Sequence, residues 1–257
     1  MSTTSAGRLA ALSLIITLAA CGGGGDGDGA AVSEGRGQAP APAPEPSPEP
    51  APTAGTAAAC YDANLGDTPG ATSEVTLRIT PSDGGDIYEY VTTGIVSGPV
   101  TFEGQEAYET TLTSTDAGPP VTTTAVYKYY AKRTGTAERT EYGLTYGPDA
   151  NTISFTSVES PPVVNGTYGL TAGQSIQLSY RDTPNLTVTF VGIESVTVPA
   201  GTYAACRFLL DSTTPAYANE QWVLVGTGLV VKEVQSQPGF GSVTIEALSV
   251  KVNGTAQ

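Results

Sequence analysis

The feature that most constrains the fold is a series of short β-type runs that occupies the chain from Val75 to Val252. The runs are rich in β-branched and aromatic residues and are separated by Gly, Pro, Asp and Asn, which is the pattern of strands and turns. No long amphipathic helix interrupts them. The predicted strands are 75–80, 87–92, 107–113, 122–130, 138–146, 152–158, 175–180, 186–198, 202–211, 221–225, 229–234 and 242–252.

The alternation within these runs indicates how the strands pack. Apolar residues alternate with other residues in 186–191 and again in 243–247, so one face of each strand is buried and the other is wet, as in antiparallel sheets. A dozen strands rarely remain one open twisted sheet. We therefore predict an all-β fold, with a curved antiparallel sheet that forms a barrel or half-open barrel. A two-sheet β-sandwich is the alternative.

The beginning of the chain has the layout of an export signal. Arg8 precedes the apolar run LAALSLIITLAA at 9–20, which is shorter than the roughly 20 residues that span a bilayer as a helix. The following Leu18-Ala19-Ala20-Cys21 resembles the lipobox of bacterial lipoproteins. The resemblance implies that Cys21 receives acyl chains such as palmitate, which anchor the protein to membrane lipid without a transmembrane helix. An ordinary secretory signal is the alternative.

Composition then divides the chain into three parts. We expect a lipoprotein signal peptide at 1–20, a lipidated cysteine with a disordered Gly- and Pro-rich linker at 21–58, and a single antiparallel β domain at 59–257. The proline alternation at 39–52 favours an extended polyproline II segment. Gly22, directly after the cysteine, resembles the sorting pattern of outer-membrane lipoproteins. The resemblance implies a lipid-anchored protein on the periplasmic face or on the cell surface.

The charge of the chain restricts its partners. With 11 basic and 25 acidic residues, the net charge is −14. Nucleic acid and anionic lipid headgroups both attract clustered positive charge, so neither is an expected partner of the β domain. The expected partners are membrane lipid through acylated Cys21, an apolar or glycan ligand, or another envelope protein.

The cysteine count is consistent with an oxidising compartment. Of three cysteines, lipidation of Cys21 leaves Cys60 and Cys206 as an even pair. We predict that these two residues form a disulfide that ties the start of the β domain to its core. Two buried free thiols are the alternative.

Two segments carry a family resemblance. Residues 196–208, VTVPAGTYAACRF, and 222–232, WVLVGTGLVVK, resemble the paired V-P-A-G-T-F and W-x-x-x-G-x-G-x-V-K signatures of uncharacterised proteobacterial exported lipoproteins. Tyr203 stands where the family pattern has Phe. The residues Pro199-Ala200-Gly201 and Gly226-Thr227-Gly228 predict two tight turns between strands. The resemblance implies a curved antiparallel sheet, and it implies no shared activity.

Catalytic chemistry is restricted by the absence of histidine from the sequence. Triads, histidine bases and histidine-bearing zinc sites are therefore excluded, and no G-x-S-x-G or S-x-x-K nucleophile motif occurs. Carboxylates remain, since glycoside hydrolysis needs only a suitably spaced pair. Those near predicted turns are Glu103, Glu106, Glu109, Glu194 and Glu220. Acids on strands and turns are usually solvated, so we predict no catalytic residues, no cofactor and no metal site.

Tyrosines gather on two neighbouring predicted strands with basic residues between them. The expected ligand face consists of Tyr127, Tyr129, Tyr142 and Tyr146, and the basic residues are Lys128, Lys132, Arg133 and Arg139. Such a face stacks on sugars or receives a partner protein, although cross-strand aromatic pairs explain it without a ligand. We therefore predict a non-catalytic binding module. A structural or interaction module of the cell envelope is the alternative, and a carboxylate-dependent glycan hydrolase is a distant third.

Overall fold

The computed structural model describes residues 55–61, 67–116, 123–135, 137–213, 216–237 and 241–257. The chain divides into two units, 1–51 and 52–257, and every described residue belongs to the second. The predicted signal peptide, Cys21 and the linker up to residue 54 lie outside the described residues. Neither of the two short helices in the described part is long enough to cross a membrane.

Nearly all of the described chain is β-strand. The elements are the 3-10 helices η1 (Ala57–Cys60) and η2 (Thr167–Gly169) and the strands β1 (Thr72–Pro81), β2 (Tyr88–Phe102), β3 (Gln105–Asp116), β4 (Thr123–Arg133), β5 (Arg139–Gly147), β6 (Phe155–Asn165), β7 (Ser175–Leu178), β8 (Leu186–Val198), β9 (Gly201–Thr213), β10 (Ala216–Leu224), β11 (Val230–Gln237), β12 (Gly241–Val252) and β13 (Thr255–Ala256).

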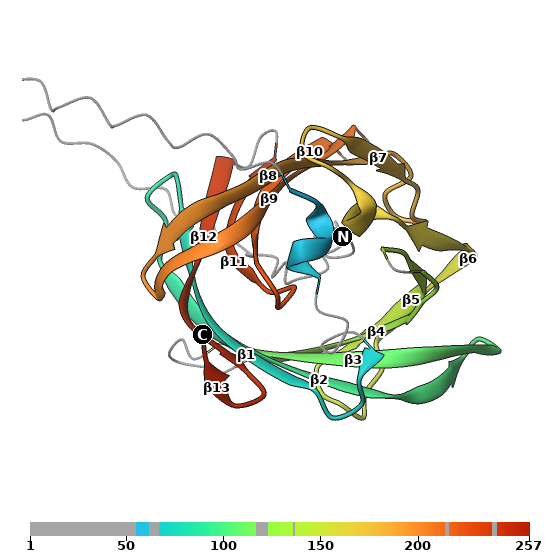
Figure 1. Cartoon of the computed structure of the whole chain (residues 1–257). Helices are drawn as coiled ribbons and strands as arrows, with labels where there is room; N and C mark the ends of the chain where they lie inside the picture. The colour runs from blue at the N-terminus through green and yellow to red at the C-terminus, as the bar shows by residue number, and fades with distance from the viewer. Residues whose placement is uncertain (1–54, 62–66, 117–122, 136, 214–215, 238–240) are drawn as a thin grey trace, which may run out of the picture. The chain divides into compact units, whose positions relative to one another are not determined.

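Twelve strands form one antiparallel sheet in which almost every neighbour in sequence is also a neighbour in space. The order is β6-β5-β4-β3-β2-β1-β12-β11-β10-β9-β8-β7, and the short β13 pairs only with β12. The β1–β12 ladder joins the first strand to the last long one. The sheet therefore curls into an up-and-down barrel that is open only between β6 and β7 (Figure 1). This confirms the predicted barrel, and no separate second sheet forms in the described residues.

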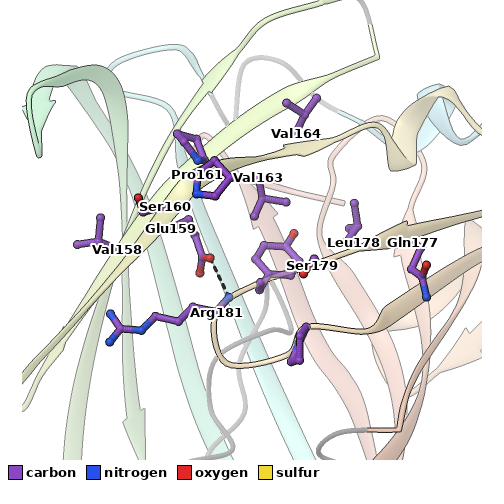
Figure 2. Close-up of a pocket in the computed structure, with 13 residues that line it drawn as sticks. Val158, Glu159, Ser160, Pro161, Val163, Val164, Gln177, Leu178, Ser179 and Arg181 are labelled. Carbon is purple, nitrogen blue, oxygen red and sulfur yellow. Dashed lines mark hydrogen bonds between the residues drawn. The ribbon is translucent and has the colours of Figure 1, made fainter.

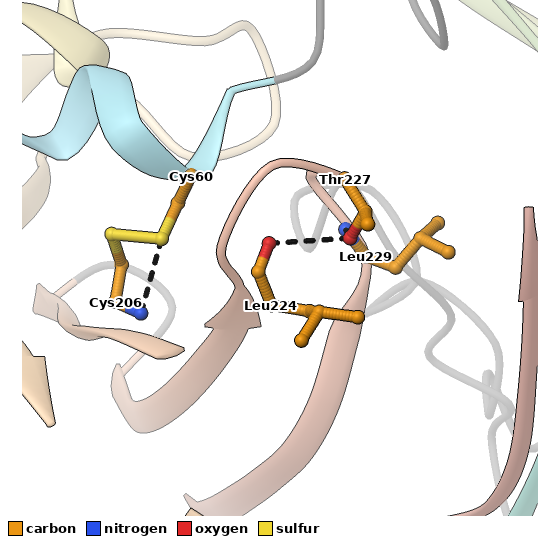
Figure 3. Close-up of a disulfide and its surroundings, with 5 residues drawn as sticks. All are labelled: Cys60, Cys206, Leu224, Thr227 and Leu229. Carbon is orange, nitrogen blue, oxygen red and sulfur yellow. Dashed lines mark hydrogen bonds between the residues drawn. A yellow bond between two sulfur atoms is a disulfide. The ribbon is translucent and has the colours of Figure 1, made fainter. Parts of the chain in front are cut away.

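The helix η1 lies within the ring of strands, where a disulfide fastens it (Figures 1 and 3). Cys60 is bonded to Cys206 of β9, with 6.0 Å between the two Cα atoms, so the structure contains the predicted disulfide. Ala57 donates its backbone N–H to Leu170, and Thr56 forms a bridge with Thr171. The described chain thus already contacts the barrel a few residues before the expected boundary at residue 59.

The turn of the second family signature also holds η1. Gly226 donates its backbone N–H to Ala59 at 2.8 Å, and the Thr227 hydroxyl donates to the carbonyl of Leu224 (Figure 3). Gly226 and Gly228 have φ values of 78° and 72°, in the left-handed region that glycine tolerates. The glycines of this signature therefore form a tight turn, as expected.

The side of the barrel that carries the disulfide is filled by side chains. Cys206 and Phe208 lie on the same face of β9, and Phe208 packs against Phe190 of β8 with 5.3 Å between ring centroids. Across the barrel wall, Leu77 of β1 and Ala247 of β12 are paired and fully or nearly fully buried. The side chains on this side of the interior form a hydrophobic core, and their burial stabilises the fold.

Candidate functional site

Three of the four predicted ligand-face tyrosines lie together on the inner face of β4 and β5. Arg133 of β4 lies over the ring of Tyr61, in the segment that follows η1, so its face of β4 is the inner one. Tyr129 and Tyr127 alternate with Arg133 along β4 and share that face. Tyr146 is the direct partner of Tyr127, with 4.8 Å between their ring centroids.

The fourth tyrosine, Tyr142, lies on the opposite face. It packs against the cluster formed by Phe102, Ala107 and Tyr130. In the pairing of β5 with β4, Tyr130 lies opposite Gly143 and Ala131 lies opposite Glu141, so Tyr142 is an extra residue in a β-bulge that reverses the alternation. The predicted face of four tyrosines is therefore a face of three, and Tyr142 is excluded from it.

The inner surface near these tyrosines is reached by solvent. Tyr129, Tyr146 and Leu112 of β3 face inward, yet they are only half-buried, unlike the core residues on the other side of the barrel. Burial together with the adjacent Tyr146 raises the pKa of Tyr127 to about 12, so its hydroxyl stays protonated and can donate a hydrogen bond at neutral pH. This part of the interior combines aromatic rings with accessible hydroxyl groups.

Polar groups adjoin the tyrosines on the same inner face. Arg139 of β5 lies directly between Arg133 of β4 and Asn165 of β6 in the sheet. The Asn165 amide donates to Glu141 Oε1 at 3.0 Å and to the hydroxyl of Tyr180 at 3.4 Å. Arg139 and Glu141 are both buried. Burial, the charge of Glu141 and a hydrogen bond to it raise the pKa of Tyr180 well above its usual value.

Two further tyrosines cover this polar group from the side of η1 and η2. Tyr61 and Tyr168 have ring centroids 4.3 Å apart, and the Tyr61 hydroxyl donates to Asp67 at 3.4 Å. Burial raises the pKa of Tyr168 to about 12 against the opposing effect of Arg139. We call the set formed by Tyr61, Tyr127, Tyr129, Tyr146, Tyr168, Tyr180, Arg139, Glu141 and Asn165 the inner polar site.

A cleft opens beside the inner polar site, where β6 and β7 fail to pair. It has a volume of about 660 Å³ and is lined by Val158, Glu159, Ser160, Pro161, Pro162, Val163, Val164, Gln177, Leu178, Ser179, Tyr180, Arg181 and Pro184 (Figure 2). Tyr180 belongs both to the cleft and to the inner polar site. The cleft and the inner polar site are therefore adjacent, with Tyr180 between them.

The gap between β6 and β7, which we call the seam, has two prolines on its β6 edge. Pro161 and Pro162 have no backbone N–H to offer to β7. Contacts across the gap use side chains instead: Glu159 accepts the backbone N–H of Arg181 at 2.9 Å (Figure 2). Since β6 and β7 run antiparallel, one inserted strand would be parallel to one edge, so strand addition suits the cleft poorly.

The predicted carboxylates are held by ion pairs and hydrogen bonds rather than gathered in this cleft. Glu106 pairs with Lys132, and Glu109 pairs with Lys128 at 3.4 Å. Glu194 accepts the indole N–H of Trp222. The turn residue Glu103 has a positive φ of 49°. Glu194 and Glu220 both pair with Arg207, and none of these acids lines the cleft.

The residues of the two family signatures meet at Trp222 of β10. Its neighbours in the sheet are Arg207 of β9 and Lys232 of β11, whose charged groups lie 5.4 and 5.2 Å from its ring. The Trp222 indole donates to Glu194 at 2.6 Å, and Arg207 pairs with Glu194 at 3.6 Å and also with Glu220. This cluster lies on the outer face, opposite Cys206, so the signatures form a structural contact away from the inner polar site.

Sequence reasoning found only part of the inner polar site. It identified Tyr127, Tyr129 and Tyr146, with Arg139 beside them, and it missed Glu141 and the residues contributed by distant segments. Glu141 could have been found from the sequence, because it lies two residues after Arg139 on the same strand and so shares its face. No local signal brings Tyr61, Tyr168 or Tyr180 to the same place, because they depend on the barrel closing.

Comparisons with known proteins show distant likenesses only. No family model matches the chain, and no curated protein matches it. A Bacteroides fragilis protein that is inferred to be exported and has a YmcC-like fold aligns with a TM-score of 0.34 and 15% identity, over 70% of this chain and 95% of its own. An inferred lipoprotein of Parabacteroides distasonis aligns with a TM-score of 0.33 and 13% identity, over 73% and 97%.

Proposed function

We propose that this protein is a lipid-anchored, non-catalytic binding protein of the bacterial outer membrane, whose barrel holds a glycan at the inner polar site. The observation that carries the proposal is the gathering of Tyr127, Tyr129 and Tyr146 on one inner face that solvent reaches. Tyrosine rings stack on the apolar faces of sugar rings, and their hydroxyl groups supply hydrogen bonds.

The polar neighbours favour a glycan over an acyl chain. Arg139, Glu141 and Asn165 are buried or half-buried beside the tyrosines. The amide of Asn165 and the carboxylate of Glu141 are bonded to each other, but the Nε of Arg139 has no partner among the described residues. A hydrocarbon ligand would leave this donor unpaired, at a cost of about 1 to 3 kcal/mol, whereas a sugar oxygen can accept its hydrogen bond.

Calorimetric titration with oligosaccharides tests the binding. The protein is the full chain with Cys21→Ser, and the probes are maltotetraose, chitotetraose and tetragalacturonate. We expect at least one probe to bind, and Tyr129→Ala to weaken its binding about tenfold, the equivalent of 1.4 kcal/mol. Tyr142→Ala is the matched control, because this tyrosine of β5 lies on the opposite face, and it should bind as the parent does. Equal affinities of the Tyr129 and Tyr142 variants, or no binding by the parent, would contradict the proposal.

The anchor is tested separately. Radiolabelled palmitate should enter the natural protein and not the Cys21→Ser variant, and only the natural protein should sediment with outer membranes. A Cys21→Ser variant that stays membrane-associated would reduce the assignment to a secreted protein.

A further inference from the structure

Arg139 is a buried cation that the described protein leaves incompletely paired. Its side chain is on the inner face, the residue is 7% exposed, and its Nε has no hydrogen-bond partner among the residues that the structure describes. A buried donor without an acceptor costs about 1 to 3 kcal/mol, and more when it is charged. An acceptor from outside the chain would remove this cost.

The nearest polar groups are already engaged elsewhere. Glu141 accepts the amide of Asn165, and Asp67 accepts the hydroxyl of Tyr61. Burial alone would lower the pKa of Arg139, but the charge of Glu141 and the hydroxyls of Tyr168 and Tyr61 raise it overall, so the guanidinium stays charged. Arg139 is therefore a permanent cation with a free donor beside the tyrosine rings.

We infer that Arg139 recognises a carboxylate on the ligand, which makes acidic sugars such as uronates the ligand class of the inner polar site. This inference rests on the proposed glycan function and adds the charge of the ligand to it. A guanidinium binds a carboxylate through paired, charge-assisted hydrogen bonds, and arginine is the residue best suited to this geometry.

The acids near Arg139 limit how much negative charge the bound group can carry. Arg133 and Arg139 both interact with the carboxylate of Asp67, and Arg139 also interacts with the carboxylate of Glu141. Asp67 and the two arginines also affect the pKa of the Tyr61 hydroxyl. Glu141 also interacts with Glu159, which lies beside Asp182 and Arg181, so the site has no excess of positive charge before a ligand arrives. A single carboxylate adds less repulsion than a phosphate, which carries close to two charges at neutral pH.

A pair of matched ligands tests the inference on the parent protein without any variant. The parent is the full chain with Cys21→Ser, and the ligands are trigalacturonate and its methyl ester, which differ only in the charge of the carboxyl groups. We expect the parent to bind trigalacturonate at least tenfold more tightly than the ester in calorimetric titrations. Equal affinities would overturn the inference while leaving the glycan function in place.

Variants then assign the preference to Arg139. In Arg139→Gln the ratio of the two affinities should fall to about one. In Arg139→Lys, which retains the positive charge but lacks the paired N–H donors of a guanidinium, the ratio should fall only in part. Tyr129→Ala should weaken both ligands and keep the ratio. If circular dichroism shows that Arg139→Gln is folded and the ratio is unchanged, another residue recognises the carboxylate.

An arm with a simple anion separates failure of the inference from failure of the glycan function. If neither sugar binds the parent, the glycan function fails. The inference about Arg139 is then judged by sodium acetate, which should raise the melting temperature of the parent, but not of Arg139→Gln, above that in sodium chloride of equal ionic strength. Equal effects of the two salts would overturn the anion site itself.

Discussion

At the scale of single residues, the buried hydroxyl of Tyr90 lowers the stability of the folded barrel. Tyr90 of β2 is 2% exposed, and its hydroxyl has no hydrogen-bond partner among the described residues. Since an unpaired buried hydroxyl opposes folding, Tyr90→Phe should increase the free energy of unfolding by about 1 kcal/mol. Urea denaturation measures this, with the exposed Tyr88→Phe on the same strand as an unchanged control. A destabilised Tyr90→Phe protein would show that the hydroxyl has a partner in solution.

The seam contains a carboxyl group whose charge opposes folding. Burial, with contributions from Asp182 and Glu141, raises the pKa of Glu159 above its usual value. A raised carboxyl pKa favours the folded state at low pH, and this contribution is lost as the pH rises through the folded-state value. Glu159→Gln should therefore be more stable than the parent at pH 7 and equal to it below about pH 4.

Thermal melts from pH 3 to 8 measure this difference. The control is Glu138→Gln, which changes an exposed glutamate. A Glu159→Gln protein that is less stable at neutral pH would mean that the ionised carboxylate strengthens the hydrogen bond to Arg181 more than its burial costs.

Residue-scale detail also explains where the sequence misled. Tyr142 and Tyr146 have the same parity, and regular alternation places both on one face. Gly143, with φ of 150°, lies in the bulge that breaks this rule. A Cβ atom there would lie 2.2 Å from the carbonyl oxygen of Ser157, so only glycine fits. A glycine within a strand is a weak indication of a bulge, and the sequence does not indicate its register.

At the scale of elements, the strand pattern was far more informative than the strand boundaries. Each of the twelve predicted runs overlaps a strand of the barrel, and β8 has the predicted bounds. β6 was predicted to end at residue 158, yet it continues to Asn165 through Pro161 and Pro162. Prolines are tolerated there because residues 159–162 have no partner in β5, where the register shifts, and the other edge of β6 faces the seam. Only the arrangement of all strands shows that β6 is an edge.

The open edges should exchange their amide hydrogens faster than the closed ladders. β7 pairs on one side only, whereas β9 is bonded on both sides, to β8 and β10. We expect peptides from β6 and β7 to take up deuterium at least tenfold faster than peptides from β9, as measured by mass spectrometry. Uptake as slow as that of β9 would indicate that the seam closes in solution. If an added ligand slows the deuterium uptake of β6 and β7 to that of β9, the ligand binds at the seam.

At the scale of the whole molecule, the disulfide joins residues 146 positions apart. Cys60 and Cys206 are both fully buried, and the bond fixes η1 inside the barrel. Replacing both by serine should lower the free energy of unfolding by about 2 to 5 kcal/mol, because the unfolded chain regains its freedom. Urea denaturation measures the loss, and treatment of the natural protein with reductant should reproduce it. A double variant of unchanged stability would contradict this role.

The pairing of β1 with β12 determines when the barrel can be completed. Ser73 lies opposite Val252, so this ladder joins the two ends of the β domain. Because a chain is synthesised from its amino end, β1 is present long before β12 emerges, and its exposed edge remains a template for aggregation during that time. Non-local pairing of this kind also slows folding. Productive folding of this protein therefore depends on holding the chain soluble until its last strands arrive.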